Sequence, residues 1–167
     1  MDDPRFIARA LELSADARHT PGTEPFGAVV VLEGRIVGEG LNHAAAHFDP
    51  TSHGEVEAIR DACRRLQRLE LSGAALYTSC EPCALCLAAM HVVGITRLVY
   101  AASLGEANDA LAHLPPALRP RVDVDALRSV AGQPAGRAGP MAVEQQGADE
   151  AMRILREWAA GHGASGG

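Results

Sequence analysis

The chain alternates short apolar segments with helical ones, and this alternation constrains the fold more than any other feature. Phe26–Leu32, Ala74–Thr78 and Ile95–Tyr100 have the length and apolar content of buried strands. The segments between them fit helices: residues 53–69 show an apolar face at helical spacing, and Pro82–Val93 is almost wholly apolar. Strand, helix, strand, helix, strand predicts parallel pairing through right-handed crossovers.

The remaining elements complete an α/β chain. Apolar spacing predicts a first helix over Phe6–Ala17, and Arg35–Leu41 is the expected hairpin partner of the first strand. Met141–Gln145 is a candidate last strand, and Ala148–Trp158 is a candidate amphipathic final helix. No internal repeat or domain boundary stands out. We therefore expect one domain over residues 1–167, with a C-terminal helix and a flexible tail from about residue 147.

Composition restricts the partners of such a chain. Its 167 residues carry a net charge of −6, from 15 basic and 21 acidic side chains. Nucleic-acid affinity comes mostly from cationic contacts, so this balance argues against a nucleic-acid partner. No apolar run approaches the roughly 20 residues of a membrane-spanning helix, and the N-terminus lacks the pattern of a signal peptide. We expect a cytoplasmic protein without a membrane partner.

Three residues have the types and spacing of metal ligands. Cys83 and Cys86 are separated by two residues, which lets both thiolates reach one tetrahedral ion. The same spacing also occurs in redox pairs and in buried core cysteines. His53 favours the metal, because it starts another helix that is expected to begin at the same sheet edge. Three protein ligands leave a fourth position for water, as in catalytic zinc sites, and Glu55 lies on the same helical turn as His53.

Longer motifs surround these residues. They are PFGAVVV at 25–31, Asn42 at the end of a hairpin, DPTSHGEVEAIRDAC at 49–63 and LYTSCEPCALCLAAM at 76–90. With them the chain resembles the cytidine deaminase superfamily, and within it the bacterial guanine deaminases, from about Pro25 to Ala102. The resemblance implies a three-layer α-β-α sandwich with a mixed central sheet of about five strands.

The resemblance also implies an activity. It is the zinc-dependent hydrolytic deamination of a free nucleobase, with guanine converted to xanthine and ammonia. One Zn²⁺ per chain is implied, held by His53, Cys83 and Cys86. Glu55 would take the proton of the attacking water and pass it to the ring and to the leaving amine. A homodimer is implied as well, in which the C-terminal segment crosses over to the partner's pocket.

Four residues are candidates for substrate contacts. Asn42 suits the edge of a purine because its amide both donates and accepts, although it is also a common turn residue. Phe26 would lie against the ring or belong to the core. Gly54 would offer its backbone N–H at a helix start. The resemblance implies an acidic contact near Glu106, with Asp109 as the competing residue; both are also ordinary loop acids.

Several alternatives stay open. The family's usual motif has Ala where this chain has Gly54, which leaves cytosine, another aminated ring or a nucleoside as the substrate. A tRNA adenosine deaminase would need a basic C-terminal helix, whereas Arg153 and Arg156 here stand among acidic residues. A non-enzymatic structural zinc module would need a fourth protein ligand. Cys80 is the nearest extra thiol, and we expect it to be structural.

Overall fold

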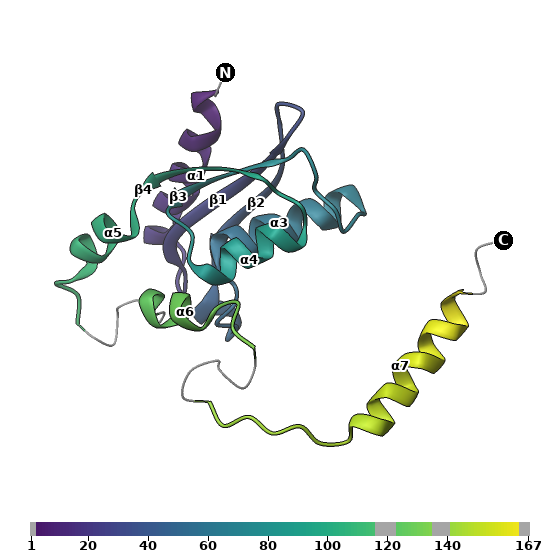
Figure 1. Ribbon diagram of the computed structural model, residues 1–167. Coiled ribbons are helices and arrows are strands. Elements are labelled where there is room, and N and C mark those ends of the chain that lie inside the picture. Colours follow the sequence, from purple (N-terminus) through teal and green to yellow (C-terminus); the bar gives the residue numbers. More distant parts are fainter. Residues whose placement is uncertain (1–2, 116–122, 135–140, 164–167) are drawn as a thin grey trace. The chain divides into compact units, whose positions relative to one another are not determined.

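The computed structural model in Figure 1 describes residues 3–115, 123–134 and 141–163 of the chain. It divides into two compact units, residues 1–129 and 130–167, which are described separately. The single domain over residues 1–167 stays a prediction. None of the helices in the described ranges combines the length and apolar content needed to cross a lipid bilayer.

The first unit contains four strands and six α-helices among its described residues. The strands are β1 (Glu24–Leu32), β2 (Arg35–Asn42), β3 (Ala75–Cys80) and β4 (Arg97–Ala102). The helices are α1 (Pro4–Asp16), α2 (Ala44–His47), α3 (Gly54–Leu66), α4 (Ala84–Val92), α5 (Leu104–Leu111) and α6 (Val124–Val130). A 3-10 turn at Ala17–His19 follows α1.

The four strands form one mixed sheet in the order β2-β1-β3-β4. β1 pairs antiparallel with both β2 and β3, whereas β3 and β4 are parallel. Strands β3 and β4 are parallel, as the crossover argument predicted, and β2 runs in the same direction. The parallel pairing predicted for Phe26–Leu32 is wrong: β1 runs antiparallel to β3 and lies between β2 and β3, because the hairpin turn after β1 reverses the chain before the first crossover helix. The carboxyl ends of β2 and β3 and the start of β1 meet at one sheet edge, which is also where α3 and α4 begin.

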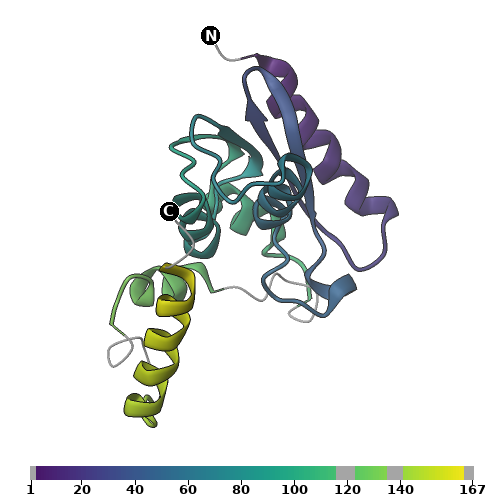
Figure 2. The ribbon, with the colours of Figure 1, turned by 90° about the vertical axis from the view of Figure 1, so that its right-hand side faces the viewer.

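Helices cover both faces of this sheet, which confirms the three-layer α/β fold (Figures 1 and 2). Along β1, Ala28 and Val30 pack with residues of α3 and α4, while Val29 and Val31 pack with Phe6 of α1. Successive side chains of a strand point to opposite faces. A strand buried on both sides therefore needs the unbroken apolar run that its sequence shows.

The second unit contains α7 (Ala148–Gly163), which confirms the predicted final helix and extends it beyond Trp158. The prediction of a strand at Met141–Gln145 is wrong: these residues are exposed and adopt no regular structure. Met141 and Val143 have the alternation of a strand but no neighbouring strand to pair with in the described part of the chain. Residues 164–167 of the expected flexible tail lie outside the described residues.

Candidate metal centre and its cavity

Three ligand-type side chains meet where α3 and α4 begin. His53 is the N-cap residue of α3 and Cys83 is that of α4, while Cys86 lies in the first turn of α4. The Nδ1 atom of His53 lies 3.5 Å from Sγ of Cys83 and 3.4 Å from Sγ of Cys86. The two sulfur atoms are 3.7 Å apart. The structure thus brings together the three residues that the sequence predicted as ligands.

These distances fit a zinc ion. Zinc bonds of about 2.3 Å to sulfur and about 2.1 Å to nitrogen place the ligand atoms of a tetrahedral site about 3.5 to 3.8 Å apart. The three measured distances agree with the edges of such a tetrahedron. Within the described ranges the group has three members, and Cys80 is not one of them. The donor set is therefore that of a site whose fourth position is left for water.

Hydrogen bonding shifts the pKa values of the two cluster cysteines in opposite directions. Contacts with the side chains of Cys86 and His53 lower the pKa of Cys83 to about 4, and the thiolate is the form that binds metal. Burial instead raises the pKa of Cys80 to about 11, so this thiol stays neutral. The hydrogen bond with Cys83 and burial raise the pKa of Cys86 as well, so it is the distances, not the pKa values, that set Cys80 apart from the three ligand-type side chains.

Glu55 places a buried carboxyl group beside the cluster. Its side chain is 6% exposed. One oxygen, Oε2, lies 3.4 Å from Sγ of Cys86, and the other accepts a hydrogen bond from Oγ1 of Thr78 at 3.4 Å. Burial raises the pKa of Glu55 above its ordinary value, which favours uptake of a proton. A buried carboxyl group that takes up a proton readily therefore lies beside the three ligand-type side chains.

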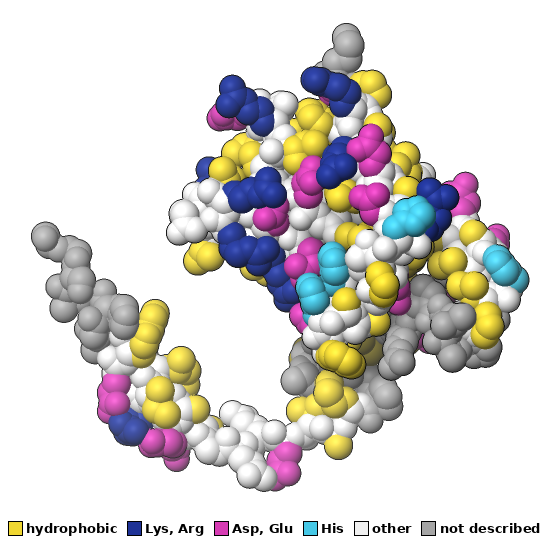
Figure 3. All heavy atoms as spheres, turned by 180° about the vertical axis from the view of Figure 1, so that it is seen from behind, with side chains coloured by type: hydrophobic (Ala, Val, Ile, Leu, Met, Phe, Trp, Pro, Cys, Tyr) yellow, Lys and Arg dark blue, Asp and Glu magenta, His cyan; other side chains and the backbone are white. Residues whose placement is uncertain are grey.

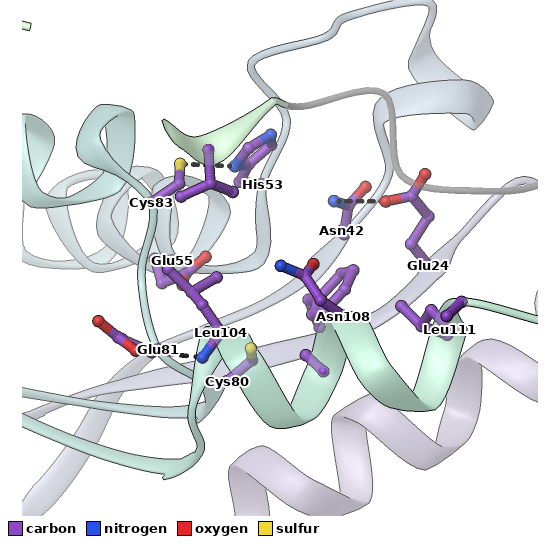
Figure 4. Close-up of a pocket in the computed structure, with 14 residues that line it drawn as sticks. Glu24, Asn42, His53, Glu55, Cys80, Glu81, Cys83, Leu104, Asn108 and Leu111 are labelled. Atoms are coloured by element: carbon purple, nitrogen blue, oxygen red, sulfur yellow. Dashed lines mark hydrogen bonds between the residues drawn. The ribbon is translucent and has the colours of Figure 1, made fainter. Parts of the chain in front are cut away.

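A cavity of about 310 Å³ opens next to His53, Cys83 and Glu55 (Figure 4). Helix α5 supplies much of its apolar wall through Leu104, Ala107 and Leu111. The other lining residues come from the sheet edge, the loop before α4, helix α5 with the residue after it, and the start of α6. They are Glu24, Phe26, Asn42, Cys80, Glu81, Asn108, Ala112 and Val124. The volume suits a single heterocyclic ring system rather than a macromolecular segment.

Two of the four predicted substrate contacts line this cavity. Asn42 is only 3% exposed; its Oδ1 accepts from the N–H of Ala44 at 3.0 Å, and its Nδ2 donates to Glu24 at 3.3 Å. Phe26 lies in the wall and is half-buried. The sequence argument missed Glu24, although the hairpin register that pairs it with Asn42 was a usable signal.

The other two predicted contacts are not among the lining residues. A Cβ at position 54 would overlap the carbonyl oxygen of Phe26, so Gly54 lets α3 pack closely on β1. Glu106 forms a capping box with Ser103, whose N–H and hydroxyl group donate to its carboxylate at 2.8 and 2.7 Å. The polar residue of α5 that lines the cavity is Asn108, and neither Glu106 nor Asp109 does so.

Glu81 fixes the cavity wall by hydrogen bonds. Its Oε2 accepts from the backbone N–H of Leu104 at 3.1 Å, at the start of α5. Its Oε1 accepts from Arg128 of α6 at 2.8 Å. One carboxylate therefore links the loop before α4 to both helices that follow the sheet.

Known proteins are similar to this chain in sequence and in fold. Residues 1–102 match the family described as the cytidine and deoxycytidylate deaminase zinc-binding region. The guanine deaminase of Bacillus subtilis is 41% identical over 110 residues, which cover 66% of this chain and 70% of that protein. A tRNA-specific adenosine deaminase of Haemophilus influenzae is 40% identical over 102 residues, 60% of this chain and 58% of its own length. The solved structure of the Bacillus subtilis guanine deaminase superposes with a TM-score of 0.79 and 32% identity, covering 96% of this chain and 95% of that one.

Proposed function

The chain belongs to the cytidine and deoxycytidylate deaminase family, and from this premise we propose that it deaminates a free nucleobase, with guanine as the first candidate. Guanine would lose its exocyclic amine as ammonia and become xanthine. The similarity to a guanine deaminase over nearly the whole fold supports this substrate. The curated relatives that are named tRNA-specific adenosine deaminases match over a shorter part of the chain.

One observation carries the proposal: a buried carboxyl group lies beside a three-ligand metal cluster at the wall of a ring-sized cavity. Zinc is the metal of this family, and His53, Cys83 and Cys86 would hold it here. A zinc ion at this position supplies Lewis acidity that makes water nucleophilic near neutral pH. The hydrolytic step needs nothing else from a cofactor.

The chain's own residues do the remaining work. Glu55 takes one proton from the attacking water and delivers it to the adjacent ring nitrogen. It then takes the proton that remains on the new hydroxyl group and delivers it to the amine, which departs as ammonia while the oxygen stays on the ring carbon as a carbonyl. The burial of Glu55 and its contact with Cys86 support this role. Asn42 would bind the edge of the ring and Phe26 its face. The roles of Gly54 and Glu106 as direct contacts stay predictions, and Asn108 is the better-placed polar residue of α5.

A tRNA substrate is the second candidate, because several relatives carry that name. The charges of the chain argue against it. In α7, Arg153 donates to both Glu150 and Glu157 at 2.6 to 2.8 Å, so its charge is already paired. On the face seen in Figure 3, Arg side chains of the first unit lie interspersed with acidic ones. Nucleic-acid binding proteins instead gather cationic groups into a continuous surface.

We further propose a homodimer in which the C-terminal segment helps to close the partner's cavity. Met152, Leu155 and Trp158 of α7 are exposed at helical spacing, and an apolar stripe of this kind is normally buried against another surface. Cytoplasmic location stays a prediction from the sequence.

A substrate panel tests the proposed function. The zinc-loaded protein is mixed with guanine, cytosine, cytidine, adenosine and a tRNA anticodon stem, and ammonia release is measured together with the ring product. We expect the highest kcat/KM with guanine, with xanthine as the product. A clear preference for cytosine would assign the site to another branch of the family, and deamination of a tRNA anticodon stem alone would favour the second candidate.

A further inference from the structure

Helix α6 packs on the two cysteines of the metal cluster, although neither metal binding nor proton transfer gives it a role. Cys83 and Cys86 are buried and form a small apolar cluster with Val56 of α3. Val124 and Leu127 of α6 are half-buried and pack against this cluster. Residues three apart lie on the same face of a helix. One face of α6 therefore belongs to the apolar layer around the sulfur atoms.

Helix α6 needs partners to stay in place, because it is only 7 residues long and none of them is fully buried. Isolated helices shorter than about 12 to 15 residues are marginal in water. Asp123 caps the first turn, since its Oδ1 accepts from the N–H of Ala126 at 2.9 Å. Near the other end, Arg128 donates to Oε1 of Glu81 at 2.8 Å. The apolar contact and this ion pair hold α6 against the first unit.

The Glu81 end of the ion pair is itself firmly held. Its backbone N–H donates to the carbonyl oxygen of Ala102 at 2.8 Å. Its second carboxylate oxygen accepts from the N–H of Leu104 at 3.1 Å, a bond that Figure 4 shows. The next residue, Pro82, is fully buried and has a fixed φ, and the ligand Cys83 follows it. The ion pair therefore joins α6 to the short segment that carries a metal ligand.

This link bears on how long a metal ion stays bound. A bound ion leaves a thiolate when water or a competing ligand takes its place, and an apolar layer outside the ligands limits that access. An ion pair as exposed as this one contributes little to the stability of a whole fold. It matters more for a helix of two turns whose packed face consists of two half-buried side chains.

We propose that Glu81 and Arg128 are positioning residues of the metal centre: their ion pair holds α6 on the apolar cluster of Cys83 and Cys86, and so slows the release of the metal. The proposal rests on the metal centre of the proposed function and not on the identity of the ring. It gives a role to a helix that holds no metal ligand and contributes only Val124 to the described lining of the cavity.

Zinc release tests the proposal without any substrate. Full-length, zinc-loaded protein is mixed with an excess of a chelator that changes colour when it binds Zn²⁺, and the rate of the colour change is followed. Arg128→Met removes the ion pair but keeps a long apolar stem. Leu127→Ala removes an apolar contact of α6. Arg128→Lys keeps a positive charge that reaches the carboxylate as a single point charge.

Two matched controls change the opposite face of the sheet. Arg9→Met removes the ion pair of α1 with Glu39, which has the same 2.8 Å length and the same 28% exposure of its acidic side chain as the pair on α6. Leu13→Ala removes a partly buried leucine that packs on the apolar cluster of Phe6 and Tyr77. Both controls remove contacts of the same kind as the test variants and leave α6 untouched.

We expect Arg128→Met and Leu127→Ala to release zinc about tenfold faster than the unaltered protein, the low end of the effect of changes just outside a ligand shell. Both controls keep the unaltered rate, and Arg128→Lys recovers part of the slow release. Glu81→Gln acts like Arg128→Met, because its amide oxygen still accepts from Leu104 but leaves no acceptor for Arg128. The double variant of Glu81→Gln and Arg128→Met is no faster than either single one, since both break one contact.

Three results would overturn the proposal. The first is release at the unaltered rate from Arg128→Met, a change of an exposed side chain that keeps the test valid even where Leu127→Ala does not fold. The second is equally fast release from the matched controls, because the effect would then be one of stability alone. The third is additive effects of Glu81→Gln and Arg128→Met.

Failure of the proposed function is seen separately. An unaltered chain that binds no zinc contradicts the metal centre itself, and metal analysis shows this before any release is measured. A chain that holds zinc and loses it faster in the α6 variants, but does not deaminate guanine, supports the role of α6 and contradicts only the substrate.

Discussion

At the scale of residues, the site depends on side chains held at helix starts. His53 and Cys83 are N-cap residues, yet neither uses its side chain to cap its helix. Their ligand atoms face one another instead, where the helix dipoles favour negative charge on sulfur. Glu55, in the first turn of α3, is thereby brought within 3.4 Å of Cys86. The chemistry of the site thus follows from where two helices begin.

Replacing Cys86 by Ser tests the metal centre. A hydroxyl group is a poor zinc ligand compared with a thiolate, so we expect the variant to lose most of its metal while the unaltered chain holds about one equivalent. Metal analysis after gentle purification measures this. Cys63→Ser is the control, since Cys63 packs at the edge of the main core. Full zinc retention in a Cys83→Ser, Cys86→Ser double variant would contradict the assignment.

Replacing Glu55 by Gln tests the proton carrier. Gln preserves the size of the side chain but does not take up and release a proton. We expect a folded, zinc-loaded protein whose kcat falls at least about 100-fold, the low end of general acid–base contributions. Steady-state ammonia release and metal content are measured on the same samples. Turnover close to that of the unaltered protein would show that another group moves the proton.

Residue types and spacing predicted the metal cluster, but not all of the cavity. Cys83 and Cys86 stand close in sequence, and His53 follows from the crossover geometry. Glu106 illustrates the limit of this reasoning, because the Ser103–Glu106 spacing of a capping box was visible in the sequence and ties one carboxylate oxygen of Glu106 to the start of α5. Once α5 begins there, helical periodicity places Leu104, Asn108 and Leu111 on one face.

At the scale of elements, close packing of α3 on the sheet sets the position of the site. A Cβ at Gly40 of β2 would overlap the carbonyl oxygen of Gly54 and the N–H of Ala58. Gly54 meets the backbone of β1 in the same way. Glycine at these two positions lets α3 approach the sheet more closely than a side chain would permit. The first turn of α3, with His53 and Glu55 at its start, is positioned by that approach.

Gly40→Ala should therefore disturb both stability and metal binding. Pushing α3 away from β2 is an overpacking change, which costs about 1 to 3 kcal/mol of unfolding free energy. Urea denaturation measures that cost, and zinc affinity reports the movement of His53. Gly105→Ala is the matched control, since a Cβ there meets nothing closer than 4.0 Å, and it should be neutral or stabilising. Equal behaviour of the two variants would refute the packing argument.

The elements were predicted better than their connections. Strands β1, β3 and β4 were found from their apolar runs, and β2 was found as the hairpin partner of β1. The position of β1 between β2 and β3 was not, since chain order does not specify which neighbours a hairpin strand takes. Helix α6 was missed because its apolar residues Val124 and Leu127 cover a small cluster rather than the main core.

At the scale of the whole molecule, the chain separates into a catalytic unit and a C-terminal unit. Residues 1–129 contain the three ligand-type side chains and all of the described lining residues of the cavity. Residues 130–167 contain α7, whose apolar side chains are exposed: Met152 at 43%, Leu155 at 58% and Trp158 at 63%. A helix of this kind gains most of its stability by burying such a face. The proposed exchange of this segment between two copies provides such a surface.

Truncation after Gly147 tests this assembly. Removing α7 takes away the apolar stripe, so we expect loss of the dimer and of most activity, while zinc stays bound because all three ligands lie in the first unit. Leu155→Asp should act in the same direction, since it places a charge in the buried face. Asp149→Asn, an exposed change on the same helix, should alter neither property. Light scattering gives the oligomeric state, and ammonia release from guanine gives the activity.

Activity depends on α7 because a closed cavity excludes water and so strengthens the polar interactions of the bound ring. A truncated protein that stays dimeric and fully active would show that α7 neither assembles the enzyme nor covers its cavity.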